Sequence, residues 1–244
     1  MPSPAPMLLF SEAWPDLPLR FEGAFSFTRQ LFPSVNLPND EYLGDTRLMS
    51  RVWDAVKRLF QSRADARHQN LPAKDFNDKD SEGFAPLHYA AARGLLDDGM
   101  DLIESGADVN LQADSGHTPI HLAASVGHAD FVRLLIEAGA EIGMQGGAVG
   151  STPLHSAAAM GRLECARLLI ESGADVNMMD AFDVTPLHEA ARAGHSGVVR
   201  LLIESEAEIH IQGGPLGLTP LRMALDNKDL DTARLLLEQG ADVN

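Results

Sequence analysis

Histidine is the residue type in this chain with the most potential for chemistry, because nine histidines could supply metal ligands or proton-transfer groups. Their spacing argues for another role. Four follow the Leu or Ile of a recurring Pro-Leu/Ile-His motif and two follow a glycine, and these six are His88, His121, His155, His188, His128 and His195. A metal site needs ligands that converge, whereas one histidine every 33 or so residues indicates a repeated structural position.

Other candidates for chemistry are equally weak. The single cysteine, Cys165, excludes an intrachain disulfide and falls within an apolar helical pattern, which predicts a small buried side chain. The glycine-rich stretch 146–150 lacks the Lys-Ser/Thr of a phosphate-binding loop and indicates a turn. We therefore predict no enzyme, no cofactor and no metal.

Charge is distributed unevenly along the chain. Residues 1–79 carry 10 acidic and 10 basic side chains, while residues 80–244 carry 25 acidic and 9 basic ones, so the whole net charge of −16 lies in the second part. Such a field repels nucleic acid and anionic lipid and favours a neutral or basic protein segment as partner. No apolar run is long enough for membrane insertion, and the lone cysteine favours an intracellular location, cytoplasmic or nuclear.

Two linked motifs recur five times in residues 80–244. The prolines of the first motif, Pro86, Pro119, Pro153, Pro186 and Pro220, are 33, 34, 33 and 34 residues apart. The second motif begins 18 residues after each proline with a glutamate, as in Glu-Ser-Gly-Ala-Asp-Val-Asn at 104–110. Repetition at this period predicts a solenoid.

Each repeat predicts two helices. Thr118 can cap a first helix whose first residue is Pro119, and Gly127 can end it in a left-handed conformation. An apolar second helix follows from about Ala129 to Ala138 and ends at Gly139. Both helices are apolar on more than one face, so neighbouring repeats must stack to bury them.

These residues resemble the ankyrin repeat, whose signature is a unit of about 33 residues with Thr-Pro-Leu-His opening the first helix. The resemblance implies an all-α ankyrin-repeat solenoid with β-hairpin fingers, which binds another protein along its concave helix and finger surface. The five repeats are expected at 80–113, 114–146, 147–179, 180–213 and 214–244, and we number them 1 to 5.

The alternating spacing indicates an internal duplication. The extra residue falls in two fingers that contain Gly146-Gly147 and Gly213-Gly214, and the segments before them also match. Repeats 2 and 3 therefore look like a copy of repeats 4 and 5, with a period of 67 residues. The two fingers are expected to share one conformation.

Both ends of the stack depart from the pattern. Residues 1–44 form an irregular segment rich in proline and aromatic residues, and 45–79 are expected to be a capping helix, a degenerate leading repeat, followed by a linker. Repeat 1 has Asp98, Gly99 and Asp101 where repeat 2 is apolar, which predicts the weakest part of the stack. The last repeat is as apolar as an internal one, which predicts a longer array or self-association through an uncapped face.

The resemblance also implies a set of binding residues, at finger tips and on the outward side of the first helices. Carried over to this sequence, they are Phe84, Tyr89, Ser115, His117, Leu122, Val126, Val149, Ser151, Ser156, Met160, Phe182, Val184, Glu189, Arg192, Leu216, Leu218 and Met223. This mostly apolar line favours a protein-binding module. The alternatives are a regulatory or targeting fragment of a larger protein and a scaffold that oligomerises through residues 1–44 or the last face.

Overall fold

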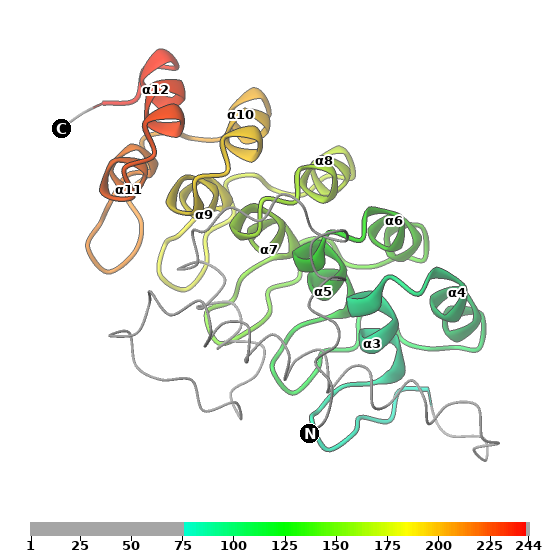
Figure 1. Ribbon diagram of the computed structural model, residues 1–244. Helices are drawn as coiled ribbons and strands as arrows, with labels where there is room; N and C mark the ends of the chain where they lie inside the picture. The colour runs from blue at the N-terminus through cyan, green and yellow to red at the C-terminus, as the bar shows by residue number, and fades with distance from the viewer. Residues whose placement is uncertain (1–75, 243–244) are drawn as a thin grey trace, which may run out of the picture.

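The computed structural model describes residues 76–242, and the predictions for residues 1–75 lie outside this part of the chain. Within residues 76–242, ten helices form two parallel rows (Figure 1). The inner row consists of α3 (Pro86–Arg93), α5 (Pro119–Val126), α7 (Pro153–Ala159), α9 (Pro186–Ala193) and α11 (Pro220–Asp226). The outer row consists of α4 (Leu96–Glu104), α6 (Ala129–Glu137), α8 (Leu163–Glu171), α10 (Ser196–Glu204) and α12 (Leu230–Glu238).

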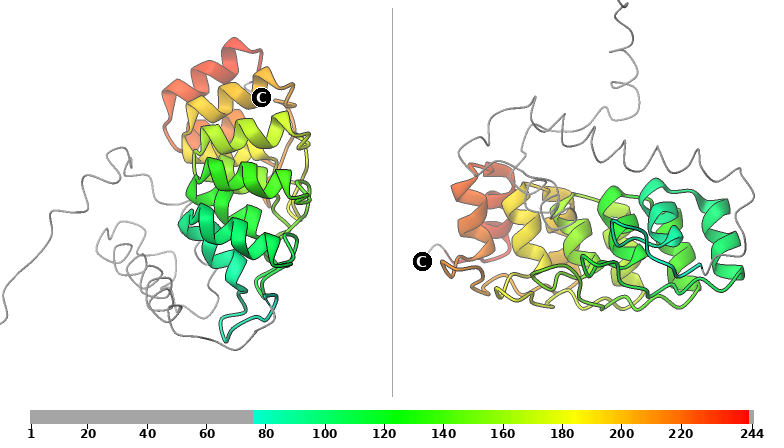
Figure 2. Two further views of the ribbon diagram at one scale, coloured as in Figure 1. Left: turned by 90° about the vertical axis from the view of Figure 1, so that its right-hand side faces the viewer. Right: turned by 90° about the horizontal axis from the view of Figure 1, so that it is seen from below.

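The predicted all-α solenoid is confirmed. Each inner helix is followed by an outer helix, and successive pairs stack side by side into a curved row, with the connecting loops gathered along one edge (Figure 2). Small side chains such as Ala123 and Ala157 are fully buried between inner helices, which lets these short helices approach closely. The outer helices add larger apolar side chains, including Phe131 and Leu169, to one continuous core.

Most inner helices begin as the sequence predicts, but the hydroxyl of Thr118, the expected cap of α5, contacts His121 Nδ1 at 2.8 Å and makes no cap hydrogen bond with a backbone N–H. Their first residue is proline, and the hydroxyls of Thr152, Thr185 and Thr219 accept the backbone N–H of the residue three positions later at 3.4, 3.5 and 3.3 Å. Repeat 1 has Ala85 at this place, and no side-chain oxygen caps α3. The start of each repeat is thus set by local chemistry in the chain.

The fingers are tight turns with little strand character. The two Gly-Gly fingers each contain one antiparallel bridge, Gly146 to Ser151 and Gly213 to Leu218, with N–H to O distances of 2.8 and 2.9 Å. The second glycines, Gly147 and Gly214, both have a φ of 75°. The expectation that these two fingers share one conformation is confirmed.

The sequence alone does not explain why α4 contains a glycine at position 99. A methyl group at this position would lie 2.5 Å from the ring of Phe131 in the next outer helix. The glycine that weakens helix propensity in α4 therefore makes room for the largest buried side chain of α6.

Candidate protein-interaction surface

Neighbouring fingers are joined directly through their backbones. The Ala181 N–H donates to the Val149 carbonyl at 2.8 Å, and the Gly214 N–H donates to the Phe182 carbonyl at 2.7 Å. The fingers also approach so closely that a methyl group at Gly213 would lie 2.5 Å from the Asp183 carbonyl oxygen. The finger tips of repeats 3, 4 and 5 thus form one ordered row, with a spacing fixed by main-chain contacts.

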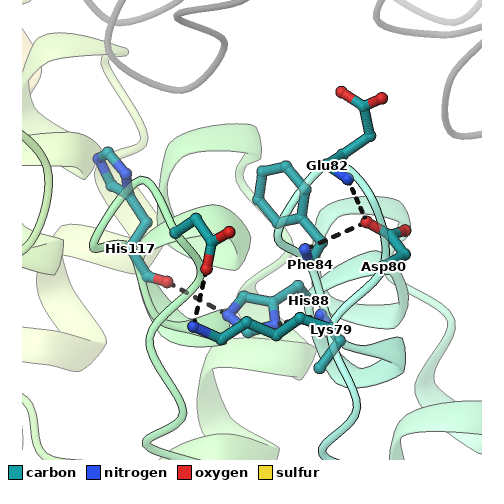
Figure 3. Close-up of polar contacts among 8 residues, drawn as sticks. Lys79, Asp80, Glu82, Phe84, His88 and His117 are labelled. Atoms are coloured by element: carbon teal, nitrogen blue, oxygen red, sulfur yellow. Dashed lines mark hydrogen bonds and ion pairs between the residues drawn. The ribbon is translucent and has the colours of Figure 1, made fainter.

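The tip of the repeat 4 finger is built around Asp180. Its Oδ1 accepts the backbone N–H groups of Phe182 at 2.8 Å and Val184 at 3.0 Å, while Asp183 adopts a left-handed φ of 59°. Asp80 holds the repeat 1 finger in the same way, accepting the N–H of the equivalent residue Glu82 at 2.8 Å (Figure 3). The turn presents residue 182 outward, and the Phe182 side chain is 50% exposed.

Polarity changes along the row of finger tips. The equivalent tip residues are Glu82, Ser115, Val149, Phe182 and Leu216, and Leu216 is 80% exposed. The first two fingers are polar and are tied by an ion pair between Lys79 and Asp114 at 3.0 Å. The last three are apolar, and Met179, which was absent from the sequence prediction, is also exposed beside them. We call Val149, Met179, Phe182 and Leu216 the apolar finger row.

The predicted binding residues differ widely in accessibility. Phe182 and Leu216 are exposed, and most of the others are partly exposed: Ser115, Val126, Val149, Ser151, Met160, Val184, Glu189, Arg192, Leu218 and Met223. Glu189 and Arg192 form an ion pair with each other on α9. Any role of this set in binding is a proposal, and the accessible members lie mainly in repeats 3 to 5.

Five predicted contact residues are buried: Phe84, Tyr89, His117, Leu122 and Ser156. Phe84 packs edge to face on Tyr89, with ring centroids 5.8 Å apart, and the Tyr89 hydroxyl donates to Asp80 Oδ2 at 2.6 Å. Four of these side chains complete the packing of repeats 1 and 2, and Ser156 lies in repeat 3. The expectation that they face outward does not match their burial, because tertiary neighbours fill the space around them.

The motif histidines link each repeat to the next one. The Thr118 N–H donates to His121 Nδ1 at 3.2 Å, and His121 Nε2–H donates to the Ser151 carbonyl at 3.0 Å. His155 bonds in the same way to the Val184 carbonyl at 2.9 Å, and His88 to the His117 carbonyl at 3.2 Å (Figure 3). This arrangement needs a neutral imidazole, because Nδ1 must accept a hydrogen bond.

Burial makes these imidazoles hard to protonate. It lowers the pKa of His88 and of His117 to about 4 and that of His121 to about 3. His117 also contacts His121 edge to face, with centroids 5.5 Å apart. The repeated histidines therefore serve as neutral structural groups, and no cluster suited to a metal ion exists among residues 76–242.

A second set of side chains links repeats 3 and 4 to the repeat that precedes each of them. The His195 Nε2–H donates to the Ala159 carbonyl at 3.2 Å, and Arg162 Nε donates to the Ser125 carbonyl at 3.0 Å. The His195 ring lies over Gly161, where a methyl group would be 2.6 Å from Nδ1. The glycines that follow α3, α5 and α7 thus each lie directly against a side chain of the next repeat.

Cys165 has no feature of a reactive thiol. It is buried in α8, and burial raises its thiol pKa to about 11. Its predicted role as a small apolar core residue is confirmed. Within the described part of the chain, no helix is both long and apolar enough to cross a bilayer.

The geometry defines a repeat solenoid, in which each repeat packs on its neighbours and the connecting loops form a row along one edge. The family model for ankyrin repeats, three copies long, matches residues 87–180 and 173–244. These matches cover well over half of the chain, which therefore belongs to the ankyrin-repeat family. Ankyrin repeats are generally protein-interaction modules and are typically non-catalytic. A comparison with curated proteins finds no match.

Proposed function

We propose that this protein binds a partner protein through the apolar finger row of repeats 3 to 5. The observation that carries the proposal is the exposure of Phe182 and Leu216 on adjacent fingers that are hydrogen-bonded to each other. Ordered, exposed apolar side chains favour association, because burying them releases water without a large cost in ordering the backbone. An intracellular location, suggested by the single cysteine, belongs to the same proposal.

The partner surface is expected to be apolar at its centre and neutral or basic around it. Residues 80–244 carry 25 acidic and 9 basic side chains, and the ion pairs among the described residues engage few of these acids. The remaining negative field speeds association with a basic surface and repels an acidic one. Association should therefore slow as the salt concentration rises.

The test compares affinity capture from the native cell by the wild-type chain and by the Phe182→Asp/Leu216→Asp variant. Leu163→Asp is the matched control, because Leu163 is an exposed leucine on the outer helix α8. A partner identified with the wild-type chain should be lost with the Phe182→Asp/Leu216→Asp variant and retained with the Leu163→Asp control. With purified proteins, the wild type and the control should bind this partner with similar affinity and the double variant should bind it more weakly. Equal binding by all three chains would place the site elsewhere.

A second candidate function is self-association through the outer face of repeat 5. Leu230 and Leu237 on α12 are 72% and 45% exposed, and Leu225 on α11 is 39% exposed. Leu225 occupies the place of Ala191 in repeat 4, which the following repeat buries completely. A second copy could cover this apolar face.

Such a pairing would be symmetric rather than head to tail. The opposite end of the stack presents the exposed carboxylates Asp98 and Asp101, and covering them with leucine side chains would strip two charges of water without a counterion. Light scattering should show a dimer that Leu225→Glu/Leu237→Glu converts to monomer. A monomeric wild type at high concentration would exclude this function and leave the finger row untouched.

A further inference from the structure

The face of α4 that points away from α6 is unlike the corresponding face of every later outer helix. Elsewhere the third and sixth residues of the helix pack toward the preceding repeat and are mostly buried: Phe131, Cys165, Val198 and Thr232 at the third place, and Leu134, Leu168, Leu201 and Leu235 at the sixth. In α4 these places hold Asp98 and Asp101, both exposed. We call this surface the leading face of α4; Figure 1 shows it at the end of the outer row.

The leading face is strongly acidic. Asp97, Asp98, Asp101 and Glu104 are the only charged residues of α4, and none of them takes part in an ion pair among the described residues. A helix that packed here through apolar side chains alone would bury carboxylates without compensation. Any occupant of this face must therefore bring a positive charge.

Contacts between successive outer helices of the described repeats indicate how an occupant of this face would lie. The fourth residue of one outer helix meets the third and sixth of the next, since a methyl group at Gly99 would lie 2.5 Å from Phe131 and 3.4 Å from Leu134. The first residue of one outer helix contacts the second residue of the next outer helix, since Leu163 of α8 would lie 3.8 Å from a methyl group placed at Gly197 of α10. One turn further along both helices, we expect the fifth residue, which is exposed in each described outer helix, to lie near the sixth residue of the next one.

Residues 45–67 of the same chain have the required chemistry in their sequence. They carry six basic residues (Arg47, Arg51, Lys57, Arg58, Arg63 and Arg67) against three acidic ones (Asp45, Asp54 and Asp65). Apolar residues recur among them at helical spacing, and the block Gln61–Ala66 resembles the block that ends each outer helix. Aligning these blocks puts Lys57 at the fifth place and Val56 at the fourth.

We propose that residues 45–67 dock on the leading face of α4 as the outer helix of a preceding repeat, with Lys57 opposite Asp101. Val56 then meets the aliphatic parts of Asp98 and Asp101, while the Lys57 ammonium lies within about one helical turn of both carboxylates. The connection from residue 62 to α3 is longer than the one between α4 and α5, so the chain can span the distance. The acidic residues of α4 thus form a docking site for the basic residues 45–67 of the same chain.

A zero-length carbodiimide cross-linker tests this placement, because it joins an amine only to a carboxylate in direct contact. The chain has only four lysines, Lys57, Lys74, Lys79 and Lys228, so the products can be assigned by mass spectrometry. We expect a bond from Lys57 to Asp101 or Asp98 in the monomer fraction, absent in Lys57→Arg. Links from Lys57 to other repeats, no link from Lys57, or links found only in dimers would overturn the proposal.

A charge-reversal cycle in the intact chain tests the energetic coupling separately. Lys57→Glu and Asp101→Lys should each speed amide exchange in α4 by about two- to fivefold, as expected for one partly exposed ion pair, and the double variant should recover. Glu137→Lys on α6 is the control and should combine additively with Lys57→Glu. If the effects of Lys57→Glu and Asp101→Lys on amide exchange are simply additive, the pairing is refuted. This outcome is independent of whether the apolar finger row binds a partner.

Discussion

The stack should lose stability steeply between pH 6.5 and pH 5, because its junction histidines must stay neutral. His88, His117 and His121 have folded-state pKa values of about 4, 4 and 3, against an ordinary value of 6.5. In this pH range these histidines bind protons in the unfolded chain but stay neutral in the folded chain, so acidification favours unfolding. The stabilisation is complete above pH 6.5 and declines as the pH falls toward the folded-state values.

The size of this effect follows from the pKa shifts. Lowering the pH from 7.5 to 5 should cost about 2 kcal/mol for each of these three histidines, or about 6 kcal/mol together. This is comparable to the whole stability of many domains, about 5–15 kcal/mol. Burial also lowers the pKa of His128, His155, His188 and His195, which acts in the same direction.

Urea unfolding followed by circular dichroism at a series of pH values measures this dependence. The slope of unfolding free energy against pH should correspond to at least about three protons taken up near pH 5. His117→Gln should reduce that slope by about one proton, because burial lowers the pKa of this imidazole. A flat stability profile between pH 6.5 and 5 would refute the neutral histidine network.

Three further perturbations test the packing of the repeats. Gly161→Ala should destabilise by about 1–3 kcal/mol more than Gly173→Ala, because both glycines have positive φ but only Gly161 lies against His195; chemical unfolding measures the difference. Thr185→Ala should lower the free energy of unfolding by about 1 kcal/mol through loss of a helix cap, with Thr185→Ser retaining most of it. Cys165 should resist thiol reagents at pH 8 in the folded protein and react at once in urea, and fast labelling without denaturant would contradict its burial.

Local chemistry in the sequence was sufficient to predict the repeats and most helix boundaries. Thr152 and Pro153 begin α7 as expected, and the predicted second helix of repeat 2, from about Ala129 to Ala138, is found at Ala129–Glu137. Capping and backbone conformation act over a few residues, so a single repeat contains the information, and five copies confirm it.

The binding surface was predictable in outline but not residue by residue. The carried-over positions included Phe182 and Leu216, which are exposed, together with Phe84, Tyr89 and Leu122, which are buried. Exposure depends on what neighbouring segments place around a side chain, and a repeat motif does not contain that information. Met179 was missed for the same reason, since nothing in its local pattern distinguishes it from the partly buried Met178.

The sequence by itself determined the architecture, the structural rather than metal-binding role of the motif histidines and the location of the excess acidic charge, whereas their neutral state follows from burial and from hydrogen bonds to the next repeat. Only the tertiary structure decided that Gly99 accommodates Phe131, that Gly161 lies beneath His195, and that the exposed apolar tips gather on the fingers of repeats 3 to 5. These contacts join residues about 30 or more positions apart. Their geometry depends on how successive repeats stack, which no single repeat encodes.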